Sequence, residues 1–220
     1  MTDRRLFLKH LIDCAAGFLA GSFYWLSKPE TSWGAVRRLL PKGTRLETLV
    51  NENPAGLDTR ELDLQPLDRF GTMGLSDQAT DLANWRLVCT GEVRREFRLS
   101  YDELRNLPAI EKQVLLICPG FFANYGRWKG ISLIDLGKKA GIKKDVDQVT
   151  ISGPAGPYEK SGRFPLKDIK SEKVFLAYQV NGETLPVKHG FPLRLVAEGY
   201  YGYEWIKYVD AVRFERIGNT

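Results

Sequence analysis

Apolar residues recur at every second position, or in short unbroken runs, along the C-terminal two thirds of the chain. This pattern predicts strands more often than helices. The predicted strands are 85–93, 113–117, 148–152, 173–180, 193–197 and 205–214. Asn181-Gly182 directly follows the fourth of these strands and predicts a tight hairpin turn. The segment 153–157 is rich in Gly and Pro, so we expect an irregular loop there.

Two short helices interrupt the strands. Ser100 and Glu103 have the spacing of a capping box, and Pro108 ends the helix that follows. A second helix begins at Ser132 and ends at Gly141, a residue typical of helix C-termini. A chain with many strands and two or three short helices belongs to the α+β class. We therefore predict a mixed β-sheet domain with a few short helices.

The chain divides into three parts by composition. Residues 29–69 are rich in Pro, Gly, Asn and charge and show no strong period, which predicts a linker or arm laid over a domain. Residues 70–220 contain the predicted strands and helices. With 220 residues, 43% of them hydrophobic, one sizeable core is expected rather than two. Residues 1–28 form the third part, which resembles a targeting signal.

The N-terminus matches the twin-arginine export pattern. Arg4 and Arg5 precede Phe7, Leu8 and Lys9, and an apolar stretch follows. A basic amphipathic first helix is the alternative interpretation. The match predicts recognition by the twin-arginine export machinery and a periplasmic location. This route carries folded proteins and is typical of those that receive a cofactor in the cytoplasm.

The fate of this leader is left open by the sequence. The apolar stretch 11–27 is slightly short for a bilayer core of about 30 Å. Tyr24 and Trp25 near its end resemble interfacial anchors. No clear Ala-x-Ala cleavage site follows. An uncleaved anchor in the inner membrane is therefore an alternative to a cleaved signal.

Charge and cysteine content exclude several classes of function. A net charge of +5 without a clustered basic stripe argues against a nucleic-acid partner and suits small anionic ligands better. The chain has three cysteines, two histidines and no C-x-x-C motif, so neither a structural zinc site nor thioredoxin-like chemistry is expected. Cys89 shares a strand face with Trp85 and Leu87, which predicts a thiol packed in the core.

Cys118 differs from Cys89, because the sequence pattern does not place it inside the core. It ends the apolar strand 113–117 and precedes Pro119-Gly120, which breaks the strand. A thiol in this position lies at the mouth of a core rather than inside it. It can serve as a metal ligand or as a nucleophile, and the local sequence leaves both open.

Three segments downstream of Cys118 carry a resemblance. They are Trp-Lys-Gly-Ile-Ser-Leu at 128–133, His-Gly-Phe-Pro-Leu-Arg at 189–194 and Gly-Tyr-Glu-Trp-Ile-Lys at 202–207. In order and spacing they resemble the molybdopterin-binding domain of the sulfite oxidase family, over about residues 66–215. The resemblance implies that family's mixed-sheet fold, a molybdenum-molybdopterin cofactor and an oxidoreductase. The implied reaction transfers an oxygen atom or two electrons on a small-molecule substrate.

The resemblance also implies roles for single residues. It makes Cys118 the one protein ligand to molybdenum, a soft metal site that suits a thiolate. The implied cofactor-binding residues are Cys118, Gly153, His189, Arg194, Trp205, Ile206 and Lys207. A cationic fork, backbone N–H groups and a lysine charge together suit a phosphate. Trp128 is expected to pack beneath the site.

The chain departs from the family pattern at one substrate-binding position. Sulfite oxidases have F-x-R-N-H before the first strand, and Thr72 stands here where that arginine is expected. Because arginine is the best donor to an oxyanion, sulfite becomes a less favoured substrate than a sulfoxide or an N-oxide. In organisation the chain resembles the exported methionine-sulfoxide reductase catalytic subunit, which has Asn where His189 stands.

Electrons are expected to be exchanged with a separate electron-transfer protein, since no haem segment is recognised; a membrane haem protein is one candidate. Two alternatives come from other classes. One is a cysteine hydrolase or transferase that uses Cys118 with His189, which needs these side chains within hydrogen-bond reach. The other is a cofactor-free binding module on the same fold.

Overall fold

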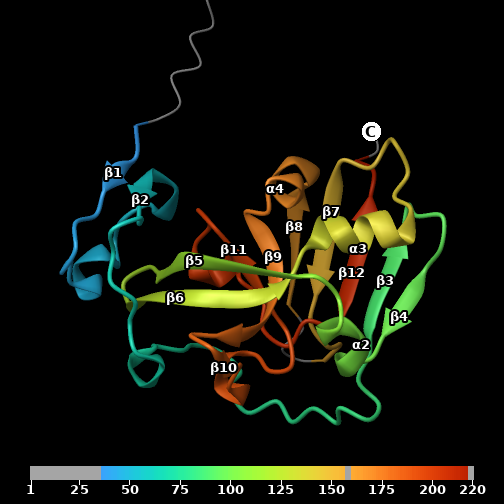
Figure 1. Cartoon of the computed structure of the whole chain (residues 1–220), viewed down its shortest axis with the longest axis horizontal. Helices are drawn as coiled ribbons and strands as arrows, with labels where there is room; N and C mark the ends of the chain where they lie inside the picture. Colours follow the sequence, from blue (N-terminus) through green and yellow to red (C-terminus); the bar gives the residue numbers. More distant parts are fainter. Residues whose placement is uncertain (1–35, 157–159, 218–220) are drawn as a thin grey trace, which may run out of the picture. The chain divides into compact units, whose positions relative to one another are not determined.

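The computed structural model describes residues 36–156 and 160–217, and Arg37–Thr220 form one compact unit (Figure 1). The predicted export signal lies outside the described residues. Within the described ranges no helix is both long enough and apolar enough to cross a membrane.

Two five-stranded sheets form the body of this unit (Figure 1). The first sheet has the order β10-β9-β6-β5, and β11 also pairs with β9. Its strands are β5 (Ala109–Cys118), β6 (Phe122–Ile131), β9 (Val174–Val180), β10 (Glu183–Thr184) and β11 (Arg194–Ala197). The second sheet has the order β4-β3-β12-β7-β8. Its strands are β3 (Leu87–Gly91), β4 (Phe97–Leu99), β7 (Gln148–Ser152), β8 (Ser161–Pro165) and β12 (Ala211–Glu215).

The second sheet is mixed, because β12 runs parallel to β3 and antiparallel to β7. The helices are short. They are α2 (Tyr101–Arg105), α3 (Leu133–Ala140) and α4 (Leu166–Lys170), with 3₁₀ turns η1 (Leu46–Leu49), η2 (Pro54–Gly56), η3 (Leu67–Arg69), η4 (Val187–His189) and η5 (Gly202–Glu204). The predicted α+β class with mixed sheets and few short helices is confirmed.

Local sequence signals account for the ends of two helices. The Ser100 hydroxyl accepts a hydrogen bond from the Glu103 amide at 3.3 Å, and the Glu103 carboxylate accepts one from the Ser100 amide at 2.8 Å. The predicted capping box of α2 is therefore present. Helix α3 ends at Gly141, which adopts a φ of 69°. Helix α3 packs against the second sheet, since Gly137 lies directly against the Phe214 ring of β12.

Strand β6 was not predicted, and its sequence explains why. Gly126, Lys129 and Gly130 interrupt the apolar alternation, although most of the strand is buried. The register shifts between Lys129 and Gly130, and a Cβ on Gly130 would lie 1.8 Å from the Leu176 carbonyl oxygen. The glycine thus permits a close strand approach that the pattern of polar and apolar residues cannot reveal.

Two further predictions were wrong or incomplete. The predicted strand 205–214 begins only at β12, and residues 205–210 are irregular. Strand β8 and helix α4 were missed, because their sequence Ser-Gly-Arg-Phe-Pro-Leu-Lys-Asp-Ile-Lys shows no clear period. Both departures lie close to the pocket described below.

Residues 37–69 pack on one face of the β5–β6 hairpin. This segment contains η1, η2, η3 and a parallel pair of β1 (Arg38–Leu39) with β2 (Leu57–Asp58). Its small core is an apolar cluster of Leu40, Leu49, Leu57, Leu62, Leu115, Ile117, Ala123 and Tyr125. Leu116 and Cys118 of β5 face the main core instead. Both faces of β5 are covered here, which explains its unbroken apolar run.

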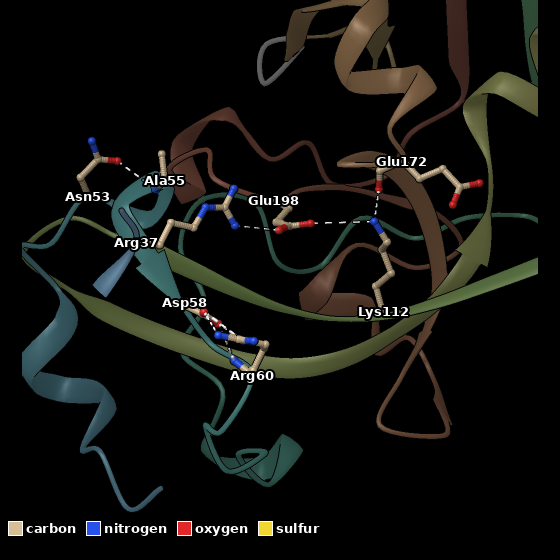
Figure 2. A network of polar contacts seen from close by, with 8 residues as sticks. All are labelled: Arg37, Asn53, Ala55, Asp58, Arg60, Lys112, Glu172 and Glu198. Carbon is tan, nitrogen blue, oxygen red and sulfur yellow. Dashed lines mark hydrogen bonds and ion pairs between the residues drawn. The ribbon is translucent and has the colours of Figure 1, made fainter. Parts of the chain in front are cut away.

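An ion pair also joins this segment to the body, as Figure 2 shows. Glu198 lies between Arg37 at 3.5 Å and the Lys112 ammonium at 3.8 Å. Lys112 in turn donates a hydrogen bond to the Glu172 carbonyl at 2.9 Å. Exposed ion pairs of this kind contribute about 0–1 kcal/mol each, so the apolar cluster is the main attachment.

Candidate functional site

The predicted site residues converge on one pocket of about 420 Å³, a size ordinary for a ligand site. The pocket is lined by Cys118, Gly153, His189, Arg194, Trp205 and Lys207, all of which the sequence had singled out. Ile206 is the one member of the set that lies beneath the lining. It is fully buried, and its carbonyl accepts a hydrogen bond from Leu195 of β11 at 2.8 Å.

Cys118 ends β5 at the wall of this pocket and is 7% exposed. Burial raises the pKa of its thiol, and the charge of Lys160 opposes that effect. Its Sγ lies 3.9 Å from the Sδ of Met73. A thiol that burial keeps protonated is a poor nucleophile. Binding a metal ion would deprotonate it.

The His-Gly and Ile-Lys motif segments lie side by side because of Gly190. Gly190 adopts a φ of 106°, and a Cβ there would lie 2.9 Å from the Lys207 Cβ. The Tyr208 amide also donates a hydrogen bond to the Gly190 carbonyl at 3.3 Å. Only glycine combines this conformation with so close an approach. The His-Gly and Ile-Lys segments therefore form one wall.

Arg194 is a buried cation that packs against two tryptophan rings. It is 5% exposed, and its guanidinium lies 5.0 Å from the Trp128 ring centre and 5.3 Å from that of Trp205. Its Nη1 donates to the His189 carbonyl at 3.0 Å. Burial lowers the pKa of Arg194 to about 9, so the group is still charged at pH 7.

Lys207 uses its ammonium group to hold a neighbouring segment in place. It donates to the Lys188 carbonyl at 3.0 Å, to the Thr72 hydroxyl at 3.3 Å and to the Leu75 carbonyl. Burial, then the charges of Arg194 and Lys160, lowers its pKa to about 8. An ammonium has three N–H donors, and these contacts engage all of them. This tethering role was not predicted from the sequence.

The pocket wall carries buried nitrogen atoms without hydrogen-bond partners. Among the described residues, His189 Nε2, Arg194 Nε and Trp205 Nε1 are buried and make no hydrogen bond. In the same part of the chain, no carboxylate lies within ion-pair distance of Arg194, Lys207 or Lys160. Buried polar groups are nearly always satisfied, so this concentration indicates a polar, anionic ligand.

The comparisons with known proteins decide the family. Residues 74–217 match the model of the oxidoreductase molybdopterin binding domain. The chain belongs to this family. It is thus an oxidoreductase by membership, as the sequence resemblance had predicted.

Curated relatives of this molybdopterin-binding domain are oxidoreductases. The uncharacterized oxidoreductase YuiH of Bacillus subtilis is 30% identical over 137 residues, which is 62% of this chain and 68% of that protein. The protein-methionine-sulfoxide reductase catalytic subunit MsrP of Gluconobacter oxydans is 31% identical over 66% of this chain and 52% of its own length. A rice NADH nitrate reductase (Oryza sativa subsp. japonica) is 32% identical over 60% of this chain and only 18% of its own length.

A solved structure has the same fold. The sulfane dehydrogenase SoxCD of Paracoccus pantotrophus superposes with a TM-score of 0.59 at 18% sequence identity. The match covers 86% of this chain and 55% of that one. The likeness confirms the predicted molybdopterin-binding fold for this chain.

The pocket of this domain fits a phosphate-bearing pterin with a metal. Arg194 supplies a buried charge with a free Nε, while His189 and Trp205 each supply a free ring nitrogen. Cys118 places a sulfur ligand in the same pocket. Phosphate oxygens suit such donors and cations, and a thiolate suits a soft metal.

The structure removes the geometric basis of the hydrolase alternative. Within the described residues, no hydrogen bond joins Cys118 to His189, and His189 Nε2 has no partner. A cysteine nucleophile needs its base within hydrogen-bond reach. The pair lines one pocket but lacks the hydrogen bond of a catalytic dyad in this structure.

His189 is held neutral by its surroundings. Burial, followed by the charges of Arg194, Lys188 and Lys207, lowers its pKa to about 4 from an ordinary 6.5. Between these two values the unfolded chain binds a proton that the folded protein does not. The free energy of unfolding therefore falls as the pH falls through this window, and His189 has no effect above it.

Replacing His189 by Asn is expected to remove this part of the acid sensitivity. Between pH 7 and 4.5 the cofactor-free wild type should lose about 2 kcal/mol more unfolding free energy than the His189→Asn variant. Urea denaturation of both proteins at the two pH values measures the difference, and the titration of carboxylates cancels in the comparison. Identical pH dependence would contradict the assigned environment of His189.

Sequence reasoning missed several pocket residues. Lys160 precedes the unpredicted strand β8, and nothing in its local sequence sets it apart from other lysines. Asn124 was hidden in the unpredicted β6. It is buried and bonded through both amide atoms to Gly71, at 2.9 Å and 2.8 Å. Met73 follows Thr72 directly, and nothing in its local sequence marked it as a pocket residue.

Proposed function

We propose that this chain binds molybdenum-molybdopterin and reduces small sulfoxides, with N-oxides as the second substrate class. The observation that carries the proposal is Arg194, a buried charge without a carboxylate partner among the described residues, in the same pocket as Cys118. Such a charge is costly unless an anion joins it. A pterin phosphate supplies that anion.

Each residue of the pocket then has a defined task. Cys118 gives the metal its protein sulfur. Arg194, His189 and Trp205 direct their free nitrogens toward the pterin and its phosphate, and Lys207 adds charge while holding residues 72–75. When bound, the cofactor supplies two-electron redox chemistry. The protein binds it, orients it and limits access of solvent.

The reaction balances with an external reductant. A sulfoxide, two electrons and two protons give a thioether and water. The electrons come from a separate electron-transfer protein, for which a membrane haem protein is a candidate. The similarity to the methionine-sulfoxide reductase subunit supports this choice of substrate, although that match spans only about half of the relative.

Thr72 supports a substrate other than sulfite. The Thr72 hydroxyl donates a hydrogen bond to the Lys188 carbonyl at 3.0 Å and accepts one from Lys207. Because a hydroxyl is uncharged, it offers no positive charge to an oxyanion in the pocket. The neighbouring lining includes the apolar side chains of Met73, Leu75 and Phe122. A neutral sulfoxide with apolar substituents is better matched to this wall than a dianion.

Holoenzyme matured in a cell that makes the cofactor provides the test. We expect about one molybdenum per chain, and turnover of sulfoxides or N-oxides with an artificial electron donor that exceeds sulfite oxidation. The Thr72→Arg variant should bind sulfite about tenfold or more tightly than the wild type, because a charge-assisted hydrogen bond is gained. Efficient sulfite oxidation by the wild type, without sulfoxide or N-oxide reduction, would reject the proposal.

We also propose periplasmic delivery by the twin-arginine machinery, with the leader cleaved or kept as an inner-membrane anchor. The support is the Arg4-Arg5 motif and its apolar continuation. Cell fractionation of the wild type against the paired Arg4→Lys and Arg5→Lys variant measures it. An unchanged location would reject this route.

A further inference from the structure

The pocket contains a third cation, Lys160, that neither motif nor family position marks. Strands β7 and β8 pair with Ser152 opposite Ser161. The next position outward pairs Gly153 with Lys160, since the Gly153 amide donates to the Lys160 carbonyl at 3.0 Å. Residues 153–156 and Lys160 all line the pocket. The pairing of β7 with β8 therefore brings this lysine into the same pocket as Cys118.

The other two cations of the pocket are already engaged. Lys207 directs its ammonium to Lys188, Thr72 and Leu75, which accounts for its three donors. Arg194 packs against Trp128 and Trp205, and its free Nε is assigned above to the cofactor phosphate. Neither group is then left for the substrate.

Lys160 differs from both. Its Nζ makes one hydrogen bond to described residues, to the Trp205 carbonyl at 3.2 Å. Two of its three N–H donors therefore have no acceptor among the described residues. Its side chain lines the pocket and remains accessible to solvent. It has no carboxylate within ion-pair distance in the part of the chain that the structure describes.

Lys160 and Cys118 line the same pocket. The charge of Lys160 opposes the rise in the pKa of the Cys118 thiol that burial causes. The side chains of Met73, Phe122 and Tyr203 line the same cavity. A group bound in this pocket would have both apolar surface and the Lys160 ammonium available to it.

We propose that Lys160 is a specificity-determining residue that donates a hydrogen bond to the oxygen of the substrate beside Cys118. It takes over the cationic contact that Thr72 no longer provides. One ammonium with two available donors suits the single oxygen of a sulfoxide or N-oxide, whose substituents face the apolar wall. This inference rests on the proposed function and deepens it by naming the residue that recognises the substrate oxygen.

The test compares Lys160→Met and Lys160→Arg holoenzymes with the wild type. The matched control is Lys167→Met, the same change at an exposed lysine of α4 outside the pocket lining. Molybdenum and pterin content are measured first. KM and kcat for a sulfoxide series follow, together with the affinity for dimethyl sulfone, an unreactive S=O ligand, from its effect on the Mo(V) electron paramagnetic resonance signal.

Lys160→Met is expected to retain its cofactor while its KM and its sulfone dissociation constant both rise about 10- to 100-fold, the range for a hydrogen bond to a charged group. Lys160→Arg should lose less, and Lys167→Met nothing. Loss of molybdenum or pterin in Lys160→Met would overturn the inference, because the lysine would then hold the cofactor. Unchanged KM and sulfone affinity would overturn it as well.

Failure of the proposed function has a different signature. A wild-type holoenzyme that reduces no sulfoxide or N-oxide rejects the function and, with it, this role for Lys160. If the wild type turns over substrate but Lys160→Met leaves KM and sulfone affinity unchanged, only the role of Lys160 is rejected.

Discussion

Cys118→Ala protein, matured where the cofactor is made, is expected to lose turnover by more than about 100-fold, since even outer-shell partners of a metal site are worth 10- to 100-fold. Its molybdenum content should fall with it. The reason is chemical: in the proposed site the thiol supplies the protein sulfur to the metal, and alanine offers no ligand. Metal analysis and pterin fluorescence on the purified protein measure the loss directly.

Cys89 is the matched control for this experiment. It is fully buried in β3, and burial raises the pKa of its thiol to about 12, so it remains a protonated core group. Cys89→Ala should lower the free energy of unfolding by about 1 kcal/mol through the small cavity that it leaves. Its molybdenum content should match the wild type. Full molybdenum occupancy in Cys118→Ala would refute the ligand assignment.

Arg194→Met is expected to separate stability from cofactor binding. Without cofactor, the wild type buries a charge against Trp128 and Trp205 with no carboxylate partner among the described residues. An apolar side chain of similar length removes that cost, so the apo variant should be as stable as the wild type or about 1 kcal/mol more stable. The lost cation–π contacts limit the gain.

Cofactor retention should change in the opposite direction. Removing the charge-assisted contact to the pterin phosphate is expected to weaken cofactor binding about 100-fold. Arg194→Lys keeps the charge but not the planar fork, so its retention should be intermediate. Thermal denaturation of the apo proteins and dialysis of the holo proteins measure the two effects separately.

The control is Arg213→Met on β12, where the arginine is largely exposed and pairs with Glu215 at 3.1 Å. This variant should alter neither apo stability beyond about 0.5 kcal/mol nor cofactor retention. A large loss of apo stability in Arg194→Met, with cofactor binding unchanged, would show that Arg194 is a structural cation. The phosphate role would then be refuted.

The local sequence determined the parts of this protein that depend on near neighbours. The capping box of α2, the glycine end of α3, strand β7 and the turn at Asn181-Gly182 all follow from contacts within a few residues. Cys118 belongs to this group, because an apolar run followed by Pro-Gly places its thiol at a strand end. The motif spacing added the family and, through it, the candidate cofactor residues.

Tertiary structure decided what long-range packing controls. Strand β6 is a strand because Gly130 lets it approach β9, and residues 205–210 are irregular because they pack along β11 and Gly190. The tether of Lys207 and the place of Lys160 depend on contacts between segments far apart in the chain. Polar and apolar periodicity records which face of an element is buried, but not which distant residue lies against it. The sequence therefore located the thiol and predicted its metal, while only the fold showed which cation stands beside it.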